Sequence, residues 1–93
     1  MATLSDAEIQ ARLAQLDRWS AADVSIEREW KLEDFAAAIA FVNRVADVAE
    51  QANHHPDILL HGWNKVRLTL STHSAGGLTE ADFALASRID ALL

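Results

Sequence analysis

Alternation of apolar and polar residues predicts a β-strand between residues 24 and 32. Every second side chain lies on one face, and most of them are apolar: Val24, Ile26, Trp30 and Leu32. Arg28 falls on the same face. Since a long basic side chain can bury its stem while its charge stays near the surface, we expect Arg28 to pack there and to reach a carboxylate or the rim of the sheet. A period of two is typical of a half-buried strand.

A second alternating stretch, residues 64–72, predicts another strand. Its apolar side chains are Val66, Leu68 and Leu70, and its polar face continues to His73. Both strands therefore present one face to a core and one to solvent.

Two shorter strands are expected, one before each alternating stretch. The first begins at Trp19 and is followed by a turn at 21–23. The other covers residues 57–61 and ends at a turn or bulge at Gly62. It follows Pro56, which favours extended backbone in the residue before it and so ends any preceding helix.

Three segments have the periodicity of amphipathic helices. Their predicted ranges are about 5–17, 33–54 and 79–93. Ser5 and Glu8 form a capping box at the start of the first helix, and Thr79 N-caps the last one. The apolar stripe of the last helix is Phe83, Ala86, Ile89 and Leu93.

The predicted order is helix, two strands, helix, two strands, helix. The connections are short, and Gly76–Gly77 is a tight turn. Short connections favour antiparallel hairpins, so we expect an α+β, two-layer fold: a four-stranded antiparallel sheet with three helices packed on one face. With 93 residues, the chain is expected to form a single domain, 1–93.

The long helix is apolar over a wider arc than one sheet can cover. One stripe consists of Phe35, Ile39, Val42, Ala46 and Ala49. The adjacent stripe consists of Phe41, Val45, Val48 and Ala52. We expect the second stripe to pack against another subunit, in a homodimer or homotetramer, and Val45→Asp to dissociate it.

Composition excludes several classes. The chain has 8 Lys and Arg against 14 Asp and Glu, a net charge of −6, and no basic run, which disfavours direct nucleic-acid binding. It lacks an apolar segment long enough to span a membrane, and Met1–Glu8 lacks the features of a secretory signal. With no cysteine present, a cytoplasmic protein is the expectation.

The candidate chemistry lies between Glu50 and Asp82. Three of the four histidines, His54, His55 and His73, fall at the predicted helix end and strand end. An unperturbed imidazole has a pKa of roughly 6.5, so histidine can both give and take a proton near neutral pH. Such a set can form a proton-handling site.

Two readings remain open for each carboxylate. Glu50 lies four residues before His54, so it could orient that imidazole, or the two could be a surface pair at a helix C-terminus. Asp82 lies three residues after Thr79, so it could complete a helix cap or orient a neighbouring histidine.

Several neighbouring residues could contact a ligand. Pro56 holds His55 extended and turns it away from the helix axis. Thr72, Ser74 and Ala75 flank His73 beside the glycine turn, where a ligand can approach the backbone closely.

Trp63 could stack on a planar ligand or belong to the core, and His61 is expected to be exposed. Imidazole and carboxylate groups also suit zinc or iron. However, no established metal-ligand spacing such as HExxH is present. We therefore expect no metal site.

Taken together, these residues resemble the pterin-4a-carbinolamine dehydratase family. The motifs are Glu50-x3-His54-His55-Pro56, Trp63-Asn64-Lys65-Val66, Leu70-Ser71-Thr72-His73 and Gly77-Leu78-Thr79-x2-Asp82. Upstream, Trp19, Arg28, Phe35 and the run 45–50 are similar as well. The resemblance covers nearly the whole chain and implies a four-stranded antiparallel sheet backed by three helices, in dimers or tetramers.

The resemblance also implies a reaction. Family members remove water from 4a-hydroxytetrahydropterin to give quinonoid dihydropterin, which recycles the cofactor of aromatic amino-acid hydroxylases. For this chain we expect no cofactor. It implies that His54 and His73 are the acid/base pair, that His55 binds the pterin, and that Glu50 and Asp82 orient the histidines.

A second function comes from another class. Some members of the family serve as dimerisation cofactors of a homeodomain transcription factor. The resemblance therefore leaves open a protein-interaction module, whose long helix would dock on a partner.

Overall fold

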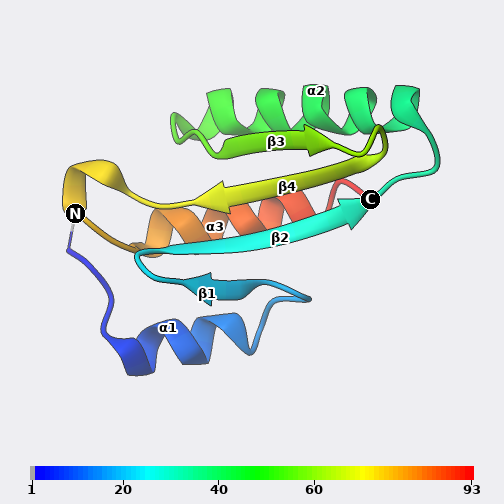
Figure 1. The fold of residues 1–93 in the computed structure, drawn as a ribbon. Coiled ribbons are helices and arrows are strands. Elements are labelled where there is room, and N and C mark those ends of the chain that lie inside the picture. Colours follow the sequence, from blue (N-terminus) through cyan, green and yellow to red (C-terminus); the bar gives the residue numbers. More distant parts are fainter. Residues whose placement is uncertain (1) are drawn as a thin grey trace.

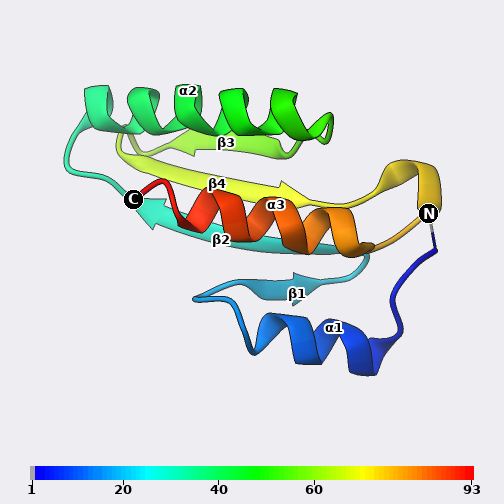
Figure 2. The same cartoon turned by 180° about the vertical axis from the view of Figure 1, so that it is seen from behind.

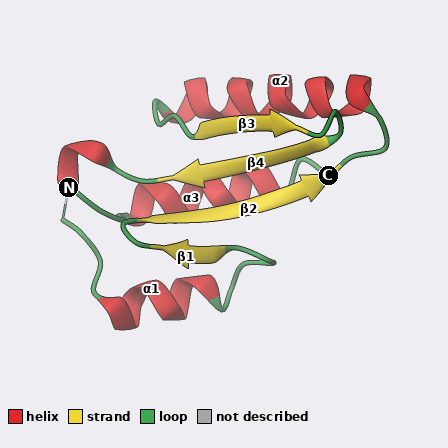
Figure 3. Ribbon diagram, viewed as in Figure 1, coloured by secondary structure: helices red, strands yellow, loops and turns green. Residues whose placement is uncertain are grey.

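The computed structural model describes residues 2–93. Its elements follow the predicted order (Figures 1 and 3): α1 (Asp6–Leu13), β1 (Ser20–Ala22), β2 (Ser25–Lys31), α2 (Phe35–Ala52), β3 (Asp57–His61), β4 (Lys65–Leu70), a 3-10 turn η1 (His73–Ala75) and α3 (Glu80–Asp90). The expected range of β3 is confirmed to the residue, and the capping boxes at Ser5 and Thr79 are both formed.

The four strands form one antiparallel sheet in the order β1-β2-β4-β3. Its register places Trp30 of β2 opposite Val66 of β4, and Ile58 of β3 opposite Leu68. Helices α2 and α3 lie over the same face of this sheet (Figure 2). The predicted α+β class is therefore confirmed.

Helix α1 is joined to α3 rather than to the open face of the sheet. Arg12 forms an ion pair with Glu80 at the start of α3, and Leu4 donates a backbone hydrogen bond to the carbonyl of Leu78. Ile9 and Leu13 pack against the core from this position.

The core lies between the sheet and the two covering helices. Every second side chain of β4 is fully buried: Val66, Leu68 and Leu70. Trp30 contacts both Trp19 and Phe41, with ring centroids 5.7 and 5.0 Å apart. The alternation read from the sequence thus identifies the inner face of β4 correctly.

The prediction of which stripe of α2 faces outward was wrong. Phe41 and Val45, which were assigned to a subunit interface, are 2% and 0% exposed and pack on the sheet. The small residues Ala38 and Ala49 are buried beside them and let the helix approach closely. Phe35 and Ile39, from the other stripe, are 54% and 41% exposed.

Two apolar residues lie outside the core because β2 begins after Val24 and α3 ends before Leu93. Val24 lies in the turn before β2 and is 51% exposed, and Leu93 follows the end of α3 and is 65% exposed. The long helix also ends at Ala52 rather than at His54.

The expectation for Arg28 is confirmed. Its guanidinium lies over the ring of Trp30, 4.5 Å from the ring centroid, and Nη1 donates to Oδ1 of Asp90 at 2.9 Å. The same oxygen accepts from Nε1 of Trp19 at 2.9 Å. One carboxylate on α3 therefore fixes both the sheet and the segment before β1.

Replacing that carboxylate should destabilise the fold. We expect Asp90→Ala to lower the free energy of unfolding by about 2 kcal/mol, because Arg28 and Trp19 lose an acceptor in a partly buried place. Asp17→Ala is the matched control, since Arg28 contacts only the backbone carbonyl of Asp17. Urea denaturation measures both variants, and an equally small loss in each would show that water replaces the Asp90 carboxylate.

Candidate active site

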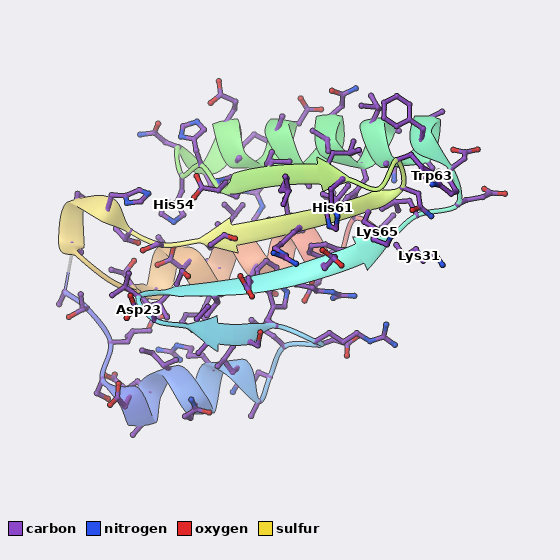
Figure 4. The ribbon with its side chains drawn as sticks, viewed as in Figure 1. Asp23, Lys31, His54, His61, Trp63 and Lys65 are labelled. Carbon is purple, nitrogen blue, oxygen red and sulfur yellow. The ribbon has the colours of Figure 1, made fainter. Side chains whose placement is uncertain are left out.

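The candidate site is a hollow at one end of the sheet, where the chain leaves α2 and β4. It has a volume of about 240 Å³ and is lined by Asn53, His54, His55, Ser71, Thr72, His73 and Ser74. The sequence predicted that the first two histidines and the third would converge, and all three border this hollow (Figure 4 marks His54).

The end of α2 sets the directions of the two adjacent histidines. Asn53 adopts the left-handed conformation, with φ 50° and ψ 42°, and its N–H donates to the carbonyls of Ala49 and Glu50. Asparagine tolerates this conformation better than most residues and is common at helix ends. The chain therefore turns at Asn53, so that His54 is largely buried while His55 is exposed.

His54 is held by a buried carboxylate. Its Nε2 lies 2.6 Å from Oδ1 of Asp82, whose side chain is 0% exposed. Asp82 also accepts the N–H of Thr79, which completes the capping box of α3. Both readings of Asp82 are thus correct, because it caps the helix and pairs with a histidine.

Glu50 pairs with a different histidine from the one expected. Its Oε2 lies 2.5 Å from Nε2 of His55. The i, i+4 spacing does not bring Glu50 and His54 together, because the helix has already ended at Asn53. This pair is exposed at the surface, in contrast to the buried pair of His54.

His73 approaches the hollow from the other side. It begins η1, three residues after the last residue of β4, and is exposed. Gly76 ends this turn at φ 74°, and Thr72 pairs with Gly77 across it. The glycine turn therefore sets where His73 and Ser74 lie.

Not every expected ligand-binding residue lines the hollow. His55, Thr72 and Ser74 do, but the hydroxyl of Thr72 is already bonded to Asp82 and Thr79. Pro56 and Ala75 are half-buried neighbours of the lining.

Trp63, which was expected to stack on a ligand or to belong to the core, does not line the hollow. Trp63 lies in the turn between β3 and β4, is 62% exposed, and is at the opposite end of the sheet from His54 (Figure 4). Its φ of 60° is the left-handed conformation of a turn residue, and Trp63 belongs neither to the buried core nor to the lining of the hollow. Sequence distance alone could not distinguish the two ends of a hairpin.

Two lining residues were not predicted, Asn53 and Ser71. Asn53 carried a signal, since an asparagine just before a His-His-Pro helix stop favours a left-handed cap. Ser71 gave less indication, and its hydroxyl donates to the carbonyl of Val24.

His61 is half-buried rather than exposed. Its Nε2 lies 2.6 Å from Oε1 of Glu29, and Arg67 adds an ion pair at 3.3 Å. The hydrogen bond from His61 lowers the pKa of Glu29. Cross-strand pairing brings these side chains together on the open face of the sheet, away from the hollow.

Comparison with known proteins places the chain in a family. Residues 2–92 match the family described as Pterin 4 alpha carbinolamine dehydratase. The chain belongs to this family. It is 55% identical to a protein of Chloroflexus aurantiacus that is provisionally named pterin-4-alpha-carbinolamine dehydratase, over 100% of this chain and 99% of the relative. A relative of the same provisional name from Acidobacterium capsulatum is 54% identical and is covered in full, as is this chain.

Solved structures share the fold. A crystal structure described as a transcriptional coactivator/pterin dehydratase from Brucella melitensis superposes with a TM-score of 0.90, at 36% identity and with 96% of each chain covered. A pterin dehydratase-like protein described as a RuBisCO assembly factor of the alpha-carboxysome gives a TM-score of 0.65 at 28% identity. That match covers 83% of this chain and 88% of the other. Solved structures with this fold are thus described both as a coactivator/pterin dehydratase and as an assembly factor.

Proposed function

We propose that this pterin dehydratase family member converts 4a-hydroxytetrahydropterin to quinonoid dihydropterin by histidine acid/base catalysis. The observation that carries the proposal is one hollow bordered by three histidines, two of which are paired with carboxylates. Family membership supports the same substrate class.

The reaction requires two proton transfers and no change of oxidation state. The bond from C4a to its hydroxyl oxygen breaks, and that oxygen takes a proton so that it leaves as water. The proton on N5 is removed, and its electron pair forms the N5–C4a double bond. Each transfer by a positioned side chain contributes about 10²–10⁴-fold.

The residues of the hollow suit these steps. His54, held by Asp82, and His73, at the start of η1, would be the acid/base pair. His55, held by Glu50, would bind the pterin ring, with Ser74 and the backbone around Ala75 beside it. Pro56 would act indirectly, by fixing the direction of His55.

No metal or other cofactor enters this mechanism. Among residues 2–93, no group of three or more His, Cys, Asp or Glu side chains is arranged to hold a metal ion.

The physiological setting we propose is recycling of pterin for an aromatic amino-acid hydroxylase in the cytoplasm. Within the same described range, no helix is long and apolar enough to cross a membrane.

A direct assay tests the proposal. A hydroxylase generates 4a-hydroxytetrahydropterin in situ, and the formation of quinonoid dihydropterin is followed by absorbance with and without this protein. We expect acceleration well above the spontaneous rate, unchanged by prior dialysis against a chelator. A rate equal to the spontaneous one would exclude this substrate, and loss of activity on chelation would exclude the metal-free mechanism.

A second candidate function is a protein-interaction module. It is favoured by the exposure of Phe35 and Ile39 on α2 and by the coactivator and assembly-factor descriptions of structural relatives. The assay separates the two, because a module without dehydratase activity would leave the spontaneous rate unchanged.

A further inference from the structure

Behind His54 lies a chain of buried hydroxyl groups that the proposed reaction does not itself require. Thr72 is 7% exposed, and Thr79 and Asp82 are 0% exposed. Oγ1 of Thr72 lies 2.8 Å from Oδ2 of Asp82 and 2.8 Å from Oγ1 of Thr79. These side chains connect the end of β4 to the start of α3.

The donor of each hydrogen bond in this series of side chains can be assigned in order. Oγ1 of Thr79 accepts the N–H of Ala81, so its own proton is free to go to Oγ1 of Thr72. A hydroxyl has a single proton, and that of Thr72 goes to Oδ2 of Asp82. The N–H of Thr79 donates to the same oxygen.

This arrangement determines the state of His54. A carboxylate only accepts hydrogen bonds, so Nε2 of His54 must carry a proton to bond with Oδ1 of Asp82 at 2.6 Å. Nδ1 is then the ring nitrogen left to give or take a proton. The partner of one imidazole nitrogen thus decides the role of the other.

We propose that Thr72 is a positioning residue that fixes the Asp82 carboxylate, so that His54 is held as the Nε2–H tautomer and reacts through Nδ1. Two donors on Oδ2, the Thr72 hydroxyl and the Thr79 amide, set the plane in which Oδ1 meets the imidazole. Without the hydroxyl, one of the two is lost and the carboxylate can rotate. The catalytic part of this inference rests on the proposed function, but the tautomer does not.

The tautomer is measured directly on the ligand-free protein. With ¹⁵N-labelled histidine at about pH 8, where an ordinary imidazole is neutral, the coupling pattern between ring protons and nitrogens distinguishes Nε2–H from Nδ1–H. We expect Nε2–H for His54 in the wild-type protein. A predominantly Nδ1–H ring would overturn the inference without any variant.

Two substitutions at position 72 isolate the hydroxyl. Thr72→Val keeps the shape and removes the donor, and should give a mixture of tautomers. Thr72→Ser keeps the donor and should restore Nε2–H. Thr69→Val is the matched control, because Thr69 lies three residues earlier, within β4, where it pairs with Glu27 and Asp57 on the open face. An unchanged tautomer in Thr72→Val, or equal disturbance in Thr72→Ser, would refute the role of the hydroxyl.

Asp82→Asn tests the same series of hydrogen bonds from the end that contacts His54. The amide oxygen can accept from Thr72 and Thr79, which leaves the amide N–H to donate to Nε2 of His54. We therefore expect the tautomer to reverse to Nδ1–H. Retention of Nε2–H would show that the hydroxyl chain does not orient this side chain.

Kinetics then connect the tautomer to turnover. Thr72→Val should lower kcat about 10-fold, less than the 10²–10⁴-fold of a complete acid/base step, with KM little changed and with recovery in Thr72→Ser. A fall in kcat that serine does not recover would show that the hydroxyl is not what matters. If the wild-type protein lacks dehydratase activity, the proposed function fails, while the tautomer measurements still decide the inference.

Discussion

His54→Ala and His73→Ala are each expected to slow dehydration about 10²-fold or more, because each removes a group that transfers a proton. His54 is fixed by the buried Asp82, so water cannot readily take its place with the same orientation. His73 is exposed at the start of η1, where a water molecule can partly substitute. The loss should therefore be larger for His54.

The control for these variants is His61→Ala. His61 also pairs with a carboxylate, Glu29, at 2.6 Å, but it lies in β3 on the open face of the sheet. Its removal should leave the rate of dehydration within about two-fold of wild type, since it transfers no proton in the proposed reaction. All rates are taken above the spontaneous background, with circular dichroism to confirm folding.

Full activity in both single variants would exclude the acid/base assignment. Equal losses in His61→Ala would instead point to a general effect of removing a histidine–carboxylate pair on the fold. The comparison therefore separates chemistry from stability.

The strands and caps could be predicted because their signals are local. The alternation in 64–72 depends only on which side chains face the core, and a capping box depends on residues three apart. The convergence of His54, His55 and His73 was also predictable, because antiparallel connections bring a helix end and a strand end to the same edge of the sheet.

The pairing within the site was less predictable because it depends on one backbone conformation. The left-handed turn at Asn53, with φ 50°, places His54 against Asp82 and His55 against Glu50. In a continued helix, Glu50 would have paired with His54 instead of His55. Periodicity does not specify where a helix stops to within one residue, so the partners could not be assigned from spacing.

The orientation of α2 was unpredictable for a different reason. Both apolar stripes combine one phenylalanine with β-branched residues and alanine, and the choice between them depends on how closely the helix can approach the sheet. Ala38 and Ala49 flank Phe41 and Val45 and leave room for the strands. Only the packed structure shows which stripe meets Trp30 and which remains outside.

Exposure of that outer stripe leads to a second large expected effect, on assembly. Phe35 and Ile39 on α2 are accompanied by Ile58 of the edge strand β3, which is 39% exposed and lies opposite Leu68 on the helix-covered face of the sheet. Covering a large apolar side chain contributes roughly 1.5–3 kcal/mol, and a two-fold interface uses each residue twice. We propose that a second copy of the chain covers this surface, because a subunit of only 93 residues has a small core and commonly gains stability by oligomerisation.

The same substitution at two positions of α2 tests this assembly. Ile39→Asp should convert a dimer or tetramer to a folded monomer in sedimentation equilibrium at micromolar concentration, because it places a charge in the interface. Val45→Asp should instead unfold the subunit, since Val45 is fully buried on the sheet and an unpaired buried charge is strongly destabilising. A wild-type monomer at that concentration would contradict the assembly. If Ile39→Asp kept the wild-type mass, any interface would lie elsewhere than on the exposed stripe of α2.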